Sequence, residues 1–177
     1  MGKQIYVITG GPGFGKTELI NELRLKGYFC SGEFARDTIE KQLKIEGDLL
    51  PWKKPKQFQE EILRLRKEFY ESVPEQTIAF ADRGIPDQMA FAKYKGFGIP
   101  EILKTYAEKY RYASKVFITP PWPQIFINDP IRNETYEEAI LIHQSILDTY
   151  FQLEYQIIEL PLIPVIERLA FILQTIF

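Results

Sequence analysis

The chain has 177 residues, of which 45% are apolar and 26% are charged, a length and composition typical of one domain with a real hydrophobic core. Because 22 basic residues nearly cancel 24 acidic ones, the chain lacks the positive field that would make nucleic acid a main partner. One cysteine, Cys30, excludes an internal disulfide and a thiol-based zinc site, and indicates a reducing compartment.

Apolar runs and periodic segments alternate along the chain. In chain order, the patterns predict a strand at 4–9, a helix at 16–26, a strand at 27–33, helices at 34–45 and 57–72, a strand at 77–82, two helices within 86–112, a strand at 115–119, a helix at 134–151, a strand at 155–160 and a final helix within 161–177. Strands that alternate with helices predict an α/β fold with a parallel sheet covered by helices on both faces. We expect one domain over residues 1–177.

Two of the predicted helices have clear apolar faces. The first face consists of Phe58, Ile62, Leu65 and Phe69. The second consists of Tyr136, Ile140, His143, Leu147 and Tyr150.

The sequence has no signal-peptide pattern at its start and no uninterrupted apolar stretch of about 18 residues. Glu167, Arg168 and Gln174 interrupt the apolar carboxyl-terminal segment. We therefore expect a cytoplasmic protein whose last helix packs on the domain, with an interfacial membrane helix as the alternative.

Residues 10–17, GGPGFGKT, match the pattern G-x-x-x-x-G-K-[ST], between a predicted strand and a predicted helix. Glycines let successive backbone N–H groups point at an anion, and the helix adds the positive end of its dipole. The pattern predicts that Lys16 reaches the β- and γ-phosphates of a nucleoside triphosphate and that Thr17 binds Mg²⁺. The expected nucleotide-binding residues are Gly10, Gly11, Gly13, Phe14, Gly15, Lys16, Thr17 and Glu18. A dinucleotide site is excluded because these glycines are not spaced as G-x-G-x-x-G.

Charged residues follow the third predicted strand at Asp82 and Arg83. A carboxylate at this end of a parallel sheet can hold Mg²⁺, and a guanidinium can bind a phosphate or another anion. The structural alternative is an Asp-Arg pair that closes the turn before Gly84.

The second predicted strand ends in SGEFAR, which places Glu33 at the sheet edge and Arg36 one helical turn later. Glu33 is a candidate base for an acceptor hydroxyl, and Arg36 a candidate ligand for an anionic group. The alternative is that Ser31 caps the following helix and that Glu33 only favours its first turn.

The segment 119–133 is long and rich in proline, and we expect it to be a lid. Its Arg132 would bring a cation over the transferred phosphoryl group, while closure excludes water. The alternative is a solvated arginine before a cap at Asn133.

Other conspicuous residues have simpler interpretations. His143 is expected to be a satisfied core histidine, and Cys30 a small buried residue. The lysines at 53, 54 and 56 form a solvated loop or attract a phosphorylated acceptor, and the tryptophans at 52 and 122 pack over a ligand or over the domain.

Together, ITGGPGFGKT, SGEFAR, ADRGIPD and the arginine-bearing loop before YEEA resemble a family of AAA-like P-loop domains, similar to the nicotinamide riboside kinase domain of bacterial NAD regulators. The resemblance spans nearly the whole chain. It implies a P-loop NTPase fold of the nucleoside/nucleotide-kinase type, a three-layer sandwich with five parallel strands in the order 2-3-1-4-5.

The resemblance also implies roles for individual residues. Triphosphate and Mg²⁺ would bind at residues 10–17 with Asp82 on the metal side. Glu33, Arg36 and Arg83 would line an acceptor pocket, and Arg132 would belong to a lid.

These features favour a small-molecule kinase that moves the γ-phosphoryl group of ATP to a metabolite hydroxyl, such as that of a nucleoside. The rival from another class is a nucleotide-dependent switch or binding module that makes no phosphorylated product. No N-K-x-D guanine-reading motif occurs, so ATP is preferred over GTP. A DNA-remodelling AAA machine is disfavoured because the length leaves little room for a further helical domain.

Overall fold

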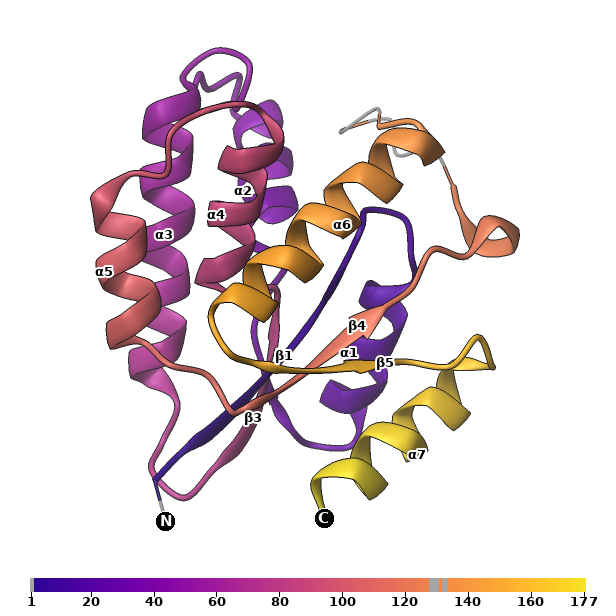
Figure 1. The fold of residues 1–177 in the computed structure, drawn as a ribbon. Helices are drawn as coiled ribbons and strands as arrows, with labels where there is room; N and C mark the ends of the chain where they lie inside the picture. The colour runs from indigo at the N-terminus through magenta and orange to yellow at the C-terminus, as the bar shows by residue number, and fades with distance from the viewer. Residues whose placement is uncertain (1, 128–130, 132–133) are drawn as a thin grey trace.

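The computed structural model describes residues 2–127, 131 and 134–177, and Figure 1 shows their arrangement. The elements are β1 (Gln4–Gly10), α1 (Lys16–Leu25), β2 (Phe29–Cys30), α2 (Phe34–Lys44), α3 (Pro55–Ser72), β3 (Ile78–Asp82), α4 (Ile85–Tyr94), α5 (Glu101–Lys109), β4 (Lys115–Thr119), the 3-10 helix η1 (Pro123–Ile125), α6 (Tyr136–Gln152), β5 (Gln156–Glu159) and α7 (Val165–Ile176). The strands form one sheet in the order β2-β3-β1-β4-β5, and every pairing is parallel. The predicted fold class and strand order are confirmed.

Strand β1 lies at the centre of the sheet and is buried on both faces, as expected for a parallel sheet. Ile5 and Val7 pack in the cluster that includes residues of α4 and α6. Tyr6 and Ile8 point the other way, into the cluster formed with α1 and α7. The sheet therefore separates two helical layers, with α1 and α7 on one face and α4 and α6 on the other (Figure 1).

Helices α2, α3 and α5 extend the α4 side of the molecule (Figure 1). A third apolar cluster joins α3, α4 and α5, and a fourth joins α2 and α3 around Phe58 and Ile62. The predicted apolar face of α3 is confirmed at these two residues.

The face predicted for the helix at 134–151 is partly wrong. Ile140 is exposed, whereas Ala139, Ile142 and Ile146 are buried beside His143. The reason is that α6 packs against both α4 and the sheet, which rotates and widens the buried arc.

The second strand differs from its prediction in two smaller ways. It is only two residues long because it lies at the sheet edge and pairs with β3 alone. At this edge Cys30 is half-buried, not buried as expected, and partial burial raises the pKa of its thiol to about 11.

The last helix, α7, packs on α1 through Leu169 and Ile172, as predicted for a packed helix. Across residues 2–127 and 134–177, none of the helices is long and apolar enough to cross a membrane.

Candidate phosphate-binding and acceptor site

The carboxyl ends of β1, β2 and β3 bring the candidate residues to one edge of the sheet, where ligands bind in open α/β folds. After β1, residues 10–17 form the phosphate loop. Gly15 has a φ of 78°, which favours glycine, and it caps the amino end of α1. Helix α1 therefore points its positive end into the loop.

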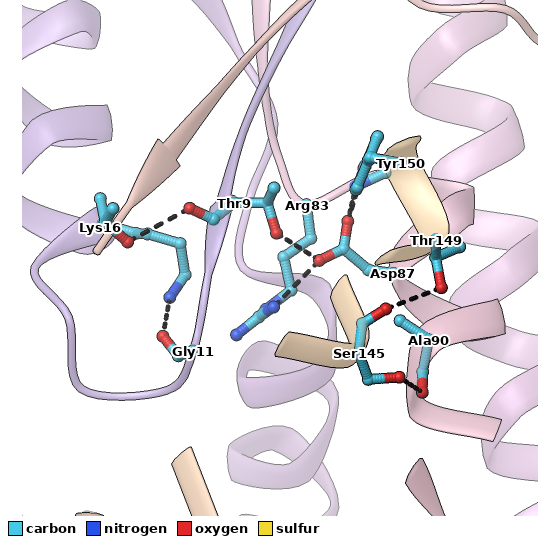
Figure 2. Close-up of polar contacts among 11 residues, drawn as sticks. Thr9, Gly11, Lys16, Arg83, Asp87, Ala90, Ser145, Thr149 and Tyr150 are labelled. Carbon is cyan, nitrogen blue, oxygen red and sulfur yellow. Dashed lines mark hydrogen bonds and ion pairs between the residues drawn. The ribbon is translucent and has the colours of Figure 1, made fainter. Parts of the chain in front are cut away.

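Lys16 folds back over the phosphate loop. Its Nζ donates to the carbonyl of Gly11 at 2.7 Å, and the side chain is buried (Figure 2). The amine is thus already held within the loop that the sequence predicted to bind phosphates.

Glu33 lies beside the first turn of α1. Thr17 Oγ1 donates to Glu33 Oε2 at 3.4 Å, and Arg36 Nε lies 3.5 Å from the same oxygen. Arg36 also lies 3.5 Å from Glu40 Oε1. The structure therefore brings together Thr17, Glu33 and Arg36, which the sequence had assigned to one site.

The alternative in which Ser31 caps α2 is wrong. Glu33 is the N-cap residue of α2 and makes no side-chain cap hydrogen bond. Ser31 Oγ instead accepts a hydrogen bond from the backbone N–H of Asp82 at 2.8 Å. This contact ties the ends of β2 and β3 together and fixes the backbone of Asp82, whose side chain is buried.

Arg83 follows Asp82 in the left-handed region, with a φ of 65°, a conformation that costs energy for a non-glycine residue and is common at functional sites. Its Nη1 donates to Asp87 Oδ1 at 3.0 Å, so the ion pair of Arg83 is with Asp87. Its Nη2 is buried and has no hydrogen-bond partner among the described residues. Figure 2 shows this nitrogen pointing toward the phosphate loop.

Asp87 is 0% exposed and was not predicted as a site residue. Its carboxylate accepts hydrogen bonds from Thr9 Oγ1, Arg83 Nη1, the N–H of Gly84 and Tyr150 Oη (Figure 2). Although burial acts to raise its pKa, the charges of Arg83 and Arg66 and these hydrogen bonds hold it below the usual value. The sequence signal that could have identified Asp87 is its position four residues after Arg83 within ADRGIPD.

Arg66 is a second residue that the sequence analysis missed. It lies on α3, is 5% exposed, and its Nε and Nη1 have no hydrogen-bond partner among the described residues. Burial lowers its pKa, and the charge of Asp87 opposes this effect. The available signal was its position four residues after Ile62, on the apolar face of the helix.

His143 is buried next to the phosphate loop, with its ring centroid 5.9 Å from that of Phe14. Burial, together with the charges of Lys16 and Arg83, lowers its pKa to about 4, so the imidazole is neutral at pH 7. The buried core position of His143 is confirmed. Its hydrogen bonds are not complete as expected, because Nδ1 lacks a partner among the described residues.

Helix α7 contributes a cation that was not predicted. A Cβ placed on Gly15 would lie 3.2 Å from Arg168 Nη1, so this guanidinium lies against the phosphate loop. It also lies 5.3 Å from the ring centroid of Trp122, which follows β4. Trp122 is therefore close to the loop, whereas Trp52 is exposed at the surface.

The described part of the predicted lid covers the phosphate loop. A Cβ on Gly13 would lie 2.7 Å from Phe126 Cδ2, and one on Gly15 would lie 2.9 Å from Ile125 Cδ1. Phe126 also packs on Phe14, at a centroid distance of 6.3 Å. Arg132 and Asn133 lie outside the described residues, and the cap of α6 is Thr135, which accepts from the N–H of Glu138.

The residues present fit a bound Mg²⁺. Thr17 offers a hydroxyl and Asp82 a carboxylate, both hard oxygen ligands. Within the described ranges, no three His, Cys, Asp or Glu side chains form a group that could hold a metal by themselves.

Comparisons with solved structures find kinases of the same fold. A deoxyadenosine kinase from M. mycoides, solved with dCMP and dCDP, is 17% identical, with a TM-score of 0.66 and 98% of each chain covered. A thymidylate kinase from Ehrlichia chaffeensis is 14% identical, with a TM-score of 0.63 and 100% of each chain covered. The NadR protein in complex with NR is 19% identical, with a TM-score of 0.56, over 89% of this chain and 45% of that one.

Among curated proteins, none matches the sequence. A family model described as an AAA domain matches residues 5–168, which include the phosphate loop, both charged strand ends and the first turn of α7. The chain belongs to this AAA-domain family.

Proposed function

We propose that this protein is a small-molecule kinase that transfers the γ-phosphoryl group of ATP to a hydroxyl of a metabolite. The observation that carries the proposal is the contact between Thr17 on the phosphate loop and Glu33 at the end of β2. It places a candidate metal ligand and a candidate base at one point, where an acceptor hydroxyl and the γ-phosphate can meet.

In the proposed reaction, the acceptor oxygen attacks the γ-phosphorus and its proton passes to Glu33. The bond between the γ-phosphorus and the bridging oxygen breaks, and that oxygen leaves with ADP. Mg²⁺, when bound, neutralises charge on the phosphate oxygens. Thr17 and Asp82 would hold it.

The remaining candidate residues would bind the phosphates, orient Glu33 and exclude water. Lys16 and the N–H groups of the loop bind the β- and γ-phosphates. Arg83 offers its spare nitrogen to the transferred group or to the acceptor, and Arg36 orients Glu33. The lid, with Arg132, excludes water.

ATP is preferred to GTP because the sequence has no N-K-x-D motif. The neighbouring kinases of known structure support a phosphotransferase, and the single cysteine, which cannot form an internal disulfide, suits a cytoplasmic protein. The alternative function is a nucleotide-dependent switch that hydrolyses ATP without a phosphorylated product.

One experiment separates the two functions. The full chain is incubated with MgATP and each member of a panel of nucleosides, nicotinamide riboside, sugars, hydroxy acids and lipids, while ADP release and product mass are recorded. A kinase releases ADP in proportion to a phosphorylated acceptor. Slow ADP release that is the same with every compound would support the switch and refute the kinase.

A further inference from the structure

Two buried guanidinium groups lie near one buried carboxylate. Arg66 on α3 and Arg83 after β3 are each 5% exposed, and both act on Asp87, which is 0% exposed. Burial of a guanidinium is costly unless negative charge and hydrogen-bond acceptors accompany it.

Asp87 cannot serve both arginines. An ionised carboxylate has about four lone-pair positions. Thr9 and Arg83 use Oδ1, and Gly84 and Tyr150 use Oδ2. These donors fill the acceptor capacity of Asp87 and leave no place for Arg66.

The phenols around Arg66 supply no negative charge. Burial raises the pKa of Tyr112 and of Tyr150, so both stay neutral at pH 7. Tyr150 directs its hydroxyl hydrogen to Asp87, and the Tyr112 oxygen already accepts from the N–H of Ile85 at 3.2 Å. The Nε and Nη1 of Arg66 therefore lack a partner among the described residues.

A third buried group adds an acceptor on the same side of the molecule. Gln88, next to Asp87 on α4, donates through Nε2 to the side chain of Gln59 on α3 at 2.9 Å. Its Oε1 is buried and has no partner among the described residues. Helices α3 and α4 therefore carry both guanidinium donors and an amide oxygen that have no hydrogen-bond partner among the described residues.

We propose that the phosphoryl acceptor carries an anionic group, a carboxylate or a phosphate monoester, and that Arg66 binds this group. The proposal rests on the proposed kinase function and names its substrate class. Either anion provides the charge and the paired oxygens that match a guanidinium. Arg83, the other arginine that acts on Asp87, points its spare nitrogen toward the phosphate loop (Figure 2).

The test measures binding of a second anion after the phosphate loop is filled. The full chain is saturated with Mg²⁺ and AMP-PNP, and calorimetry then compares thymidine monophosphate with thymidine, gluconate with glucose, and inorganic phosphate alone. We expect at least one anion to bind about tenfold or more tightly than its neutral partner, and the identity of that anion separates phosphate from carboxylate.

Variants assign the binding to Arg66. Arg66→Met should abolish the preference for the anion, and Arg66→Lys should retain part of it, because lysine keeps the charge but not the bidentate geometry. Arg64→Met is the matched control, since Arg64 lies on the same helix but is exposed and pairs with Glu61 and Glu68. It should bind anions as the native protein does.

The outcomes separate this proposal from the kinase function. Anion binding through Arg66, together with ADP release that no compound of the panel increases, would support the anion subsite and refute the kinase function. Equal phosphorylation of neutral and anionic compounds would support the kinase and overturn the subsite. Failure of all three anions to bind, or unchanged binding in a folded Arg66→Met or Arg66→Lys protein, would also overturn it.

Discussion

The hydroxyl of Thr17 donates to the carboxylate of Glu33 across 3.4 Å and thereby joins the phosphate loop to the end of β2. The two residues come from different βα connections and meet because parallel strands place their carboxyl ends at one edge of the sheet. Under the proposed kinase function, Glu33 would act on the acceptor beside the loop that binds the γ-phosphate.

Glu33→Gln should separate transfer from nucleotide binding. The amide cannot take the acceptor proton, so kcat should fall roughly 100-fold or more, while ATP affinity stays near the native value. Single-turnover transfer and calorimetry with ATP measure the two effects. If transfer remained at the native rate in this variant, Glu33 would not be the base.

Lys16→Ala should remove triphosphate binding. The amine sits within the phosphate loop at 2.7 Å from the carbonyl of Gly11, so its loss takes away a charge that faces the β- and γ-phosphates. Turnover should fall about 100-fold or more. Fluorescent ATP binding measures the affinity, and circular dichroism verifies that the variant is folded; native affinity in the folded variant would contradict the prediction.

Asp87→Asn should destabilise the fold. The substitution leaves Arg83 without its ion-pair partner and removes the negative charge near the buried Arg66, so the free energy of unfolding should fall by about 3–5 kcal/mol. Asp148→Asn, at an exposed position on α6, should change it by less than about 0.5 kcal/mol. Urea denaturation measures both variants, and equal losses would refute the role of Asp87.

His143 should make stability depend on pH in a defined window. Its pKa is about 4 in the folded protein against 6.5 in an unperturbed histidine, so the unfolded chain binds the proton more readily. The free energy of unfolding should therefore fall as pH falls from about 6.5 to 4, by up to about 3 kcal/mol, and this contribution should be constant above pH 7. His143→Gln should remove this part of the pH profile, and an unchanged profile would contradict it.

Arg132 and Arg168 should have separable effects. Arg168 lies against Gly15, so Arg168→Met should weaken ATP binding about tenfold. Arg132→Ala should instead lower kcat with a small effect on ATP affinity, as expected for a lid cation that acts on the transition state. Steady-state kinetics with ATP as the varied substrate distinguish them, and an unchanged kcat in Arg132→Ala would remove that arginine from the mechanism.

Several parts of this structure could be predicted because their causes are local. The phosphate loop needs left-handed glycines beside a strand and a helix, and GGPGFGKT contains that information in eight consecutive residues. The order in which strands and helices alternate was readable from periodicity, and the family resemblance supplied the strand order. The roles of Glu33, Arg36, Asp82, Arg83 and Arg132 stay predictions.

The buried network around Asp87 could not be predicted, because its members come from β1, the turn after β3, α4 and α6. From sequence alone, a charged residue is expected to be exposed to solvent. Only the packing of the elements around it shows that it is buried. The same limit applied to Ile140, whose exposure follows from how α6 rests between α4 and the sheet.

By itself, then, the sequence determined the phosphate loop and the alternation of elements, since backbone conformation and apolar periodicity depend on near neighbours. Tertiary structure alone decided which charges are buried together and which remain without a partner. It did so because side chains far apart in the chain meet where the elements pack, and their desolvation depends on every element around them.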